Sequence, residues 1–173
     1  MLRYLGVDTQ ILPNDTPVGE LRDLDGLILS GGAARVGLTG ELGNCADYLS
    51  LEIPILGICA GHQFMARHYG GEAGEAQKPE FGAATISLVG DGGPLFRGTP
   101  SEQTVWESHN DEVTVAPPGF SVVANSDSCE VQAMQNEQLG RFGLQFHPEV
   151  NDTEFGSNIF ENFVRLCKPP DSA

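Results

Sequence analysis

The sequence predicts a one-domain α/β fold, with a mixed, mostly parallel sheet flanked by helices and an added β-rich portion. Continuous apolar runs at Thr9 to Leu12, Gly26 to Leu29 and Ile53 to Cys59 are bounded by Gly, Pro or Asp, which is typical of buried parallel strands. From Gly82 to Phe146 the apolar segments are shorter and Gly, Pro and Asn turns separate them, which indicates a β-rich region. Together the two patterns favour a layered α/β domain.

Helices are expected after the strands, at Ala60 to Tyr69 and at Thr153 to Cys167. The second segment carries one apolar face, made by Phe155, Ile159, Phe160, Phe163 and Leu166. Five strands are expected in the β-rich portion, with a turn at Glu80 to Gly82 before them: Thr85 to Val89, Thr104 to Glu107, Glu112 to Val115, Ser121 to Ala124 and Gly143 to Phe146. One domain over residues 1–168 and a loose tail at 169–173 account for the whole sequence.

Composition excludes several classes of function. The chain has 24 acidic and 9 basic residues, a net charge of −15, which repels nucleic-acid phosphates and anionic lipid. No apolar stretch approaches the ~18 residues of a membrane span, so we expect a cytoplasmic protein without a nucleic-acid or membrane partner. The acid-rich, lysine-poor composition also predicts adaptation to high salt, with an ordinary acidic bacterial or archaeal enzyme as the alternative. The four cysteines show no paired spacing and the four histidines no metal-ligand spacing, so neither disulfides nor a metal site is expected.

A cysteine lies where a strand is expected to turn into a helix. Cys59 is flanked two residues away on each side by Gly57 and Gly61, in the form of a nucleophile elbow. Glycine removes the side-chain collision that a sharp strand-to-helix turn would cause. The free N–H groups and the positive dipole end of the helix favour a thiolate. The segment therefore predicts a nucleophile, with a buried structural cysteine as the alternative.

His147 is the best candidate for the base that such a nucleophile needs. It follows an apolar strand, Pro148 stiffens the exit, and Glu149 is two residues on, where a carboxylate can orient the imidazole. A third element, Ser30-Gly31-Gly32, ends another strand and can bring a backbone N–H close to a developing oxyanion. The loop lacks the Gly-Lys-Ser/Thr ending of a phosphate-binding loop, so ATP binding is not supported.

Three segments together resemble the class I (triad) glutamine amidotransferases, in this order and at similar separations: Ser30 to Gly32, Gly57 to Gln63 and Gln145 to Glu149. The resemblance covers nearly the whole chain and implies a flavodoxin-like fold. It implies that Cys59 is the nucleophile, His147 the general base and acid, and Glu149 its orienting carboxylate. It further implies an oxyanion hole at Gly32 and Ala60, and contacts to glutamine from Gln63, Gly31, Ser108 and His109.

Within this family, Trp106 to Val113 resembles the Ser-His-x-Asp segment found in the glutaminase part of GMP synthases. This resemblance implies a separate ATP-pyrophosphatase subunit, in a heterodimer or higher hetero-oligomer, which uses ATP and magnesium to aminate xanthosine monophosphate. His109 and Asp111 would contact that partner. The chain itself would need no metal or organic cofactor.

Several alternatives remain open at the level of sequence. The chain could serve another synthetase, act as a free-standing γ-glutamyl hydrolase, or be an inactive regulatory subunit of the same fold. The segment from Trp106 to Val113 could also be an ordinary β-turn between two strands. Compared with the family pattern, the first strand and most of the first helix are expected to be missing before Leu5.

Overall fold

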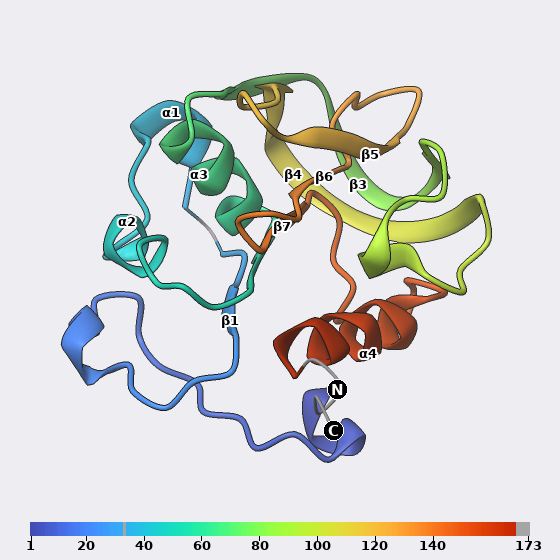
Figure 1. The fold of residues 1–173 in the computed structure, drawn as a ribbon. Coiled ribbons are helices and arrows are strands. Elements are labelled where there is room, and N and C mark those ends of the chain that lie inside the picture. Colours follow the sequence, from blue (N-terminus) through green and yellow to red (C-terminus); the bar gives the residue numbers. More distant parts are fainter. Residues whose placement is uncertain (33, 169–173) are drawn as a thin grey trace.

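The computed structural model describes residues 1–32 and 34–168, and within them a single seven-stranded sheet forms the centre of the molecule (Figure 1). The strand order is β1-β2-β7-β6-β5-β3-β4. The strands are β1 (Leu27–Leu29), β2 (Ile55–Ile58), β3 (Glu72–Leu88), β4 (Glu102–Val115), β5 (Ser121–Asn125), β6 (Ala133–Asn136) and β7 (Arg141–Leu144). The α-helices are α1 (Val36–Thr39), α2 (Cys45–Tyr48), α3 (Ala60–His68) and α4 (Gly156–Cys167), with 3-10 turns at Leu2–Leu5, Val18–Glu20 and Pro94–Phe96.

The predicted α/β class, the mixed sheet and the β-rich portion are confirmed, but within the described sheet only β1, β2 and β7 pair in parallel. The neighbours from β7 through β6, β5 and β3 to β4 all pair antiparallel. The physical reason is the length of the connections. A parallel pair needs a crossover of a dozen or more residues, whereas the strands after α3 mostly follow one another through short connections that suit antiparallel pairs.

Some expected strand boundaries were wrong. Thr9 to Leu12 forms no strand, because no neighbouring strand pairs with it and Ile11 remains 94% exposed. The two strands expected at 104–107 and 112–115 are parts of one continuous strand, β4. The turn expected at Glu80 to Gly82 lies inside β3, which continues through Gly82 although the φ of this residue is +111°. The strand β6 was missed because its sequence, Ala-Met-Gln-Asn, contains no β-branched or aromatic residue.

The predicted helices α3 and α4 cover opposite faces of the sheet (Figure 1). Side chains alternate along β2, so Leu56 and Ile58 join the core that contains Ile159 and Phe163 of α4. Ile55 points the other way and joins the core beneath α3. The carboxyl end of β2 therefore lies between two packed layers, which hold the turn into α3 in place.

Among the residues that the structure describes, none of the helices has both the length and the apolar character required to cross a lipid bilayer. The loose tail expected at 169–173 lies outside the described residues.

Candidate active site

Cys59 occupies a strained turn between β2 and α3. Its φ is 52°, in the left-handed region that favours glycine, and such a conformation costs roughly 1–3 kcal/mol at a non-glycine residue. A Cβ on Gly57 would lie 2.7 Å from the backbone of Gly61, and a Cβ on Gly61 would collide with the backbone oxygen of Leu29. The two glycines therefore let the strand, the turn and the helix meet closely, as the elbow motif predicts.

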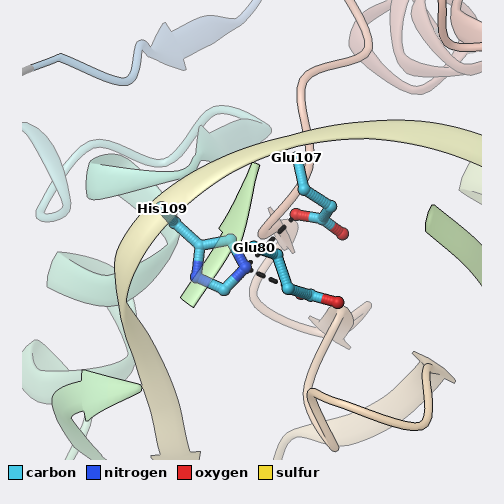
Figure 2. A group of neighbouring side chains, drawn as sticks. All are labelled: Glu80, Glu107 and His109. Atoms are coloured by element: carbon cyan, nitrogen blue, oxygen red, sulfur yellow. Dashed lines mark hydrogen bonds and ion pairs between the residues drawn. The ribbon is translucent and has the colours of Figure 1, made fainter. Parts of the chain in front are cut away.

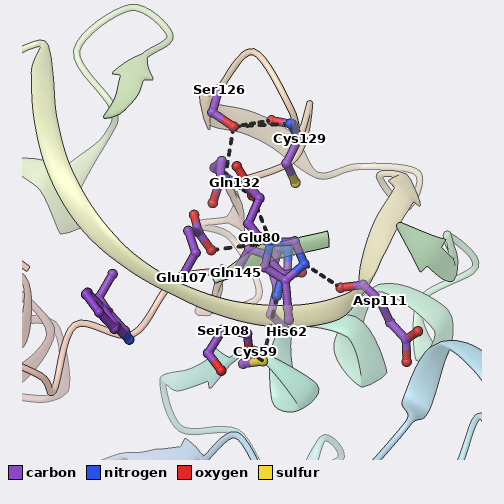
Figure 3. A network of polar contacts seen from close by, with 12 residues as sticks. Cys59, His62, Glu80, Glu107, Ser108, Asp111, Ser126, Cys129, Gln132 and Gln145 are labelled. Carbon is purple, nitrogen blue, oxygen red and sulfur yellow. Dashed lines mark hydrogen bonds and ion pairs between the residues drawn. The ribbon is translucent and has the colours of Figure 1, made fainter. Parts of the chain in front are cut away.

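The Cys59 thiol lies in a nearly closed polar environment, with the residue 7% exposed. The sulfur can donate to the backbone oxygen of Ser108, and Gln145 Nε2 donates to the sulfur, both across 3.7 Å (Figure 3). Ala60 begins α3, and the first N–H groups of a helix have no partner within the helix. Gln145 Nε2 and the first N–H groups of α3 can therefore stabilise negative charge on the sulfur or on an oxygen bound next to it.

His147 is held between Cys59 and Glu149. Its Nδ1 lies 2.5 Å from Glu149 Oε1, and hydrogen bonding to Cys59 and then to Glu149 raises the pKa of His147 to about 10. Its backbone is fixed as well, because its N–H donates to the oxygen of Trp106 at 2.9 Å and Thr153 Oγ1 donates to its oxygen at 2.6 Å. The imidazolium is thereby favoured next to the thiol, with its orientation fixed by the carboxylate.

The loop after β1 lies directly over these two residues. A Cβ on Gly31 would lie 3.0 Å from Cys59 Cβ and 3.3 Å from His147 Cε1, so a larger residue would press on both. Gly32 has open space around its α-carbon and lines the cavity at Cys59. Ala33, the next residue, lies outside the described part of the chain.

A cavity of about 180 Å³ opens at Cys59 and is lined by residues from the glycine loop, α3, β3 and β4: Gly32, Ala34, Arg35, Gln63, Phe81, Ser108, His109, Asn110 and Asp111. Its volume equals that of about six waters at roughly 30 Å³ each, which suits a ligand of amino-acid size. A larger hollow of about 550 Å³, beside Leu88 and Pro94, contains none of the predicted site residues. The smaller cavity is therefore the candidate site.

Of the residues expected to contact glutamine, Gly31, Ser108 and Gln63 are all at this site. Ser108 is exposed on the cavity wall. Gln63 is only 2% exposed, and its amide N–H₂ donates to the backbone oxygen of Asp111 at 2.7 Å and to Gln145 Oε1 at 3.2 Å. The N–H₂ group of Gln63 is therefore committed to holding β4 and Gln145.

The expectation that His109 and Asp111 contact a partner needs correction. Alternate residues of a strand share a face, and along β4 the buried face includes both positions, whereas Ser108 and Asn110 are exposed. The side chain of Asp111 is 3% exposed and accepts two hydrogen bonds from Arg35, from Nη2 at 2.7 Å and from Nε at 2.9 Å. The side chain of His109 is 1% exposed and lies within hydrogen-bonding distance of Glu80. Both side chains therefore form contacts within this chain and are not exposed for a contact with a partner.

Sequence reasoning missed three residues that shape the site. Gln145 contacts the sulfur, Arg35 ties the glycine loop to β4, and Thr153 fixes the backbone of His147. Gln145 had a signal, since it lies two residues before His147 at the end of a buried strand. Nothing in the sequence marks Arg35 or Thr153. Arg35 binds Asp111, which is 76 residues away, and Thr153 binds a backbone oxygen, which no side-chain motif reveals.

Comparisons with known proteins agree with this geometry. A family model described as glutamine amidotransferase class-I matches residues 1–167. A GMP synthase (glutamine-hydrolyzing) subunit of Thermococcus kodakarensis is 45% identical over 172 residues, which cover 96% of this chain and 89% of the relative. The protein of the same name from Archaeoglobus fulgidus is 44% identical over 168 residues, with the same coverage of both chains.

Solved structures give the same result. A crystal structure from Thermoplasma acidophilum, described as that of a GMP synthase subunit, is 45% identical with a TM-score of 0.90, covering 96% of this chain and 84% of that one. A glutamine amidotransferase from Thermotoga maritima is 26% identical with a TM-score of 0.71, covering 95% and 72%. With the triad-like arrangement of Cys59, His147 and Glu149, these matches show that the chain belongs to the class I glutamine amidotransferase family.

Proposed function

We propose that this chain is the glutamine-hydrolysing subunit of a GMP synthase and supplies ammonia to a separate synthetase subunit. The observation that carries the proposal is the geometry around the elbow: Cys59 and His147 both lie next to Gly31, and His147 is paired with Glu149, beside a cavity of amino-acid size. The names of the archaeal relatives support the choice of synthetase.

In the first half of the proposed reaction, the thiolate of Cys59 attacks the side-chain carboxamide carbon of glutamine. The negative charge that develops on the amide oxygen is stabilised by the N–H groups of Ala60 and Gly32. The imidazolium of His147 then gives its proton to the departing nitrogen, the C–N bond breaks, and ammonia and a glutamyl thioester remain.

In the second half, neutral His147 takes a proton from a water that attacks the thioester. The new tetrahedral intermediate uses the same two N–H groups and collapses by breaking the C–S bond. Glutamate leaves, and the thiolate and the imidazolium are restored. Glu149 acts throughout as the orienting group, since it holds Nδ1 and leaves Nε2 free to exchange the proton. These steps need no metal or organic cofactor in this chain.

The acceptor belongs to the partner in this proposal. A separate ATP-pyrophosphatase subunit would use ATP and magnesium to activate xanthosine monophosphate, and the ammonia would convert it to GMP. We propose a heterodimer or higher hetero-oligomer of the two subunits. We expect weak glutaminase activity from the isolated chain and a large rise when the partner, ATP and xanthosine monophosphate are present, because closure of catalytic loops commonly depends on the partner's substrates.

The test measures glutamate release from glutamine by the wild-type chain and by Cys59→Ala, with Cys45→Ala as the matched control because Cys45 is a buried packing residue. We expect Cys59→Ala to lose at least about 10³-fold in rate, and a glutamine-analogue electrophile to label Cys59 alone. Cys45→Ala should retain turnover. Full activity in Cys59→Ala would refute the mechanism.

A second comparison distinguishes this proposal from a free-standing hydrolase and from an amidotransferase of another synthetase. Faster cleavage of γ-glutamyl peptides than of glutamine, with no response to the synthetase subunit, would show a free-standing hydrolase instead. Stimulation by a different synthetase and its acceptor would retain the amidotransferase mechanism but replace the GMP synthase assignment.

A further inference from the structure

A cluster of three ionisable side chains is buried between β3 and β4 (Figure 2). Along β4, Glu107 and His109 alternate with Ser108, which lies on the opposite face. Glu107 and His109 are two residues apart on β4 and therefore share a face, and Glu80 of β3 is the direct cross-strand partner of His109. The side chains of His109, Glu107 and Glu80 are 1%, 0% and 10% exposed.

The three side chains converge on one point. His109 Nε2 lies 2.8 Å from Glu80 Oε2 and 3.4 Å from Glu107 Oε2, and one donor atom from each residue lies within 4.8 Å of the other two. Donor atoms that bind one metal ion at about 2.1 Å are separated by roughly 3.0–3.4 Å in octahedral or tetrahedral geometry. The two distances from His109 Nε2 are close to this spacing, and the two carboxylates lie within 4.8 Å of each other.

The hydrogen bond on the other side of the imidazole determines what Nε2 can do. Nδ1 lies 2.9 Å from the backbone oxygen of Asp111, which can only accept, so Nδ1 carries the hydrogen. Nε2 lies 2.8 Å from Glu80 and 3.4 Å from Glu107, so a proton or a metal ion must lie between this nitrogen and the carboxylates. In the neutral ring the lone pair of Nε2 is available to a metal ion that takes the place of that proton. A metal-binding histidine usually donates its other ring N–H to a carboxylate or a backbone oxygen, as Nδ1 of His109 does.

Glu107 provides a second, independent observation. It is fully buried, and within the described part of the chain neither of its carboxylate oxygens accepts a well-formed hydrogen bond, His109 Nε2 lying 3.4 Å from Oε2. A buried carboxylate without a donor is strongly unfavourable unless a cation or a proton accompanies it. Gln132 is also fully buried, its Nε2 donates to Glu80 at 3.2 Å, and its amide oxygen has no partner (Figure 3).

We propose that Glu80, Glu107 and His109 bind one first-row divalent cation. Two carboxylates and a dication are neutral together, which suits a buried site. One imidazole with two carboxylates favours Mn²⁺, Co²⁺ or Zn²⁺ over Mg²⁺ and Ca²⁺, which prefer oxygen ligands alone. Water, or the Gln132 amide oxygen after rotation of that group, completes the coordination.

The bound cation would have a structural role at this position. The β3–β4 ladder is interrupted between Glu75 and Glu80, and it resumes at the pair of Glu80 and His109. A cation at this pair joins the two strands where the ladder resumes, next to Ser108, whose backbone oxygen contacts Cys59. We expect the ion to stabilise the protein and to take no part in bond breaking.

The test uses the full chain, freed of metal, in a Cys59→Ser background, because the Cys59 and His147 pair can itself attract soft metals. Mn²⁺ and Co²⁺ are titrated by calorimetry, and the visible spectrum of bound Co²⁺ reports its ligands. We expect one equivalent to bind, a rise in thermal midpoint, and a Co²⁺ spectrum without thiolate charge transfer. Glu107→Gln should weaken affinity at least tenfold, whereas Glu102→Gln, on the exposed part of β4, should not.

Two results would overturn the proposal. One is failure of the folded protein to bind Mn²⁺, Co²⁺ or Zn²⁺ in this background, which would leave protons as the only cations in the cluster. The other is unchanged affinity in both Glu107→Gln and Glu80→Gln. The second variant protects the test if the first fails to fold, and near-ultraviolet circular dichroism checks the fold of each.

Discussion

His147 lies between a carboxylate and a thiol, and its charge depends on both. Hydrogen bonds to Cys59 and Glu149 raise its pKa to about 10, so the imidazolium persists at neutral pH. The folded-state pKa of His147 lies above the unfolded value of about 6.5. Its contribution to the unfolding free energy is therefore complete at pH values below about 6.5. The stabilisation is lost as the pH rises through about 10.

The first prediction concerns Glu149→Gln. Removal of the carboxylate lowers the pKa of His147, so the general acid loses its proton at a lower pH. The alkaline limb of the kcat/KM profile for glutamine hydrolysis should move to lower pH, and the rate at neutral pH should fall less than in His147→Ala. Glu161→Gln, an exposed change on α4, is the control. An alkaline limb that does not move would show that Glu149 only fills space.

For single residues, the sequence predicted the roles of those that lie in local motifs. It did not predict contacts or burial that depend on segments far apart in the sequence. Cys59, His147 and Glu149 were predictable because their neighbours in sequence carry the signal. The burial of His109 and Asp111 was not, because Trp106 to Val113 was compared only with a motif or a turn. In a continuous strand, residues two apart share a face, so Glu107, His109 and Asp111 all lie on the buried face of β4.

The helix after the elbow carries two histidines in different environments. On α3, His62 is fully buried and its Nε2 lies 3.1 Å from the backbone oxygen of Val131, whereas His68 is exposed. Burial lowers the pKa of His62 to about 3. The unfolded chain therefore takes up a proton near pH 6.5 that the folded chain does not, and stability falls as the pH falls below this value.

The second prediction compares the two positions. His62→Gln should reduce the loss of unfolding free energy between pH 6.5 and pH 4, by up to about 1.4 kcal/mol per pH unit, while glutamine can still donate to Val131. His68→Gln, an exposed change on the same helix, is the control for the substitution itself. Urea denaturation at several pH values measures both. Equal slopes in the wild type and His62→Gln would contradict the assignment.

Among the elements, β1 and β2 were predictable because each is a short, continuous apolar run, and α4 because it has an apolar face with the period of a helix. α3 was predictable from its place after the glycine-flanked turn. The order of the sheet was not predictable from period alone. β7 lies between β2 and β6, far from β2 in sequence, and only packing of the complete chain selects that pairing. The break in the β3–β4 ladder likewise depends on cross-strand partners.

Across the whole molecule, Arg141 joins the sheet to the segment before β2. It is 4% exposed and its guanidinium donates to Tyr69 Oη and to five backbone oxygens: those of Leu49, Leu51, Ile53, Leu139 and Gly140. A planar fork with five N–H donors can serve these six acceptors, because the two N–H groups of Nη1 are shared among three oxygens, whereas an ammonium group with three N–H donors cannot.

The third prediction is that Arg141→Lys lowers the unfolding free energy by about 3 kcal/mol, because several buried carbonyls lose their donors. Arg165→Lys is the matched control. Arg165 is exposed and pairs with Glu161 one helical turn away, so its replacement should change stability by less than about 0.5 kcal/mol. Chemical denaturation of both variants decides, and equal small effects would contradict the role of Arg141.

The fourth prediction follows from the net charge of −15. Repulsion among surface carboxylates opposes folding, and salt screens it, since the Debye length falls from about 10 Å at 0.1 M to about 3 Å at 1 M. The thermal midpoint should rise with KCl over this range, and the rise should shrink near pH 5 as carboxylates become protonated. A midpoint independent of salt at neutral pH would argue against adaptation to high salt.

The left-handed backbone at Cys59 has a consequence for how such a chain would change over generations. Glycine would fit the turn with less strain, so Cys59→Gly removes the chemistry while relieving a conformation that costs roughly 1–3 kcal/mol. Selection for stability and selection for catalysis thus oppose each other at one codon. A lineage that no longer depended on glutamine hydrolysis should lose this cysteine early, whereas Gly57 and Gly61, which the packing itself requires, should persist.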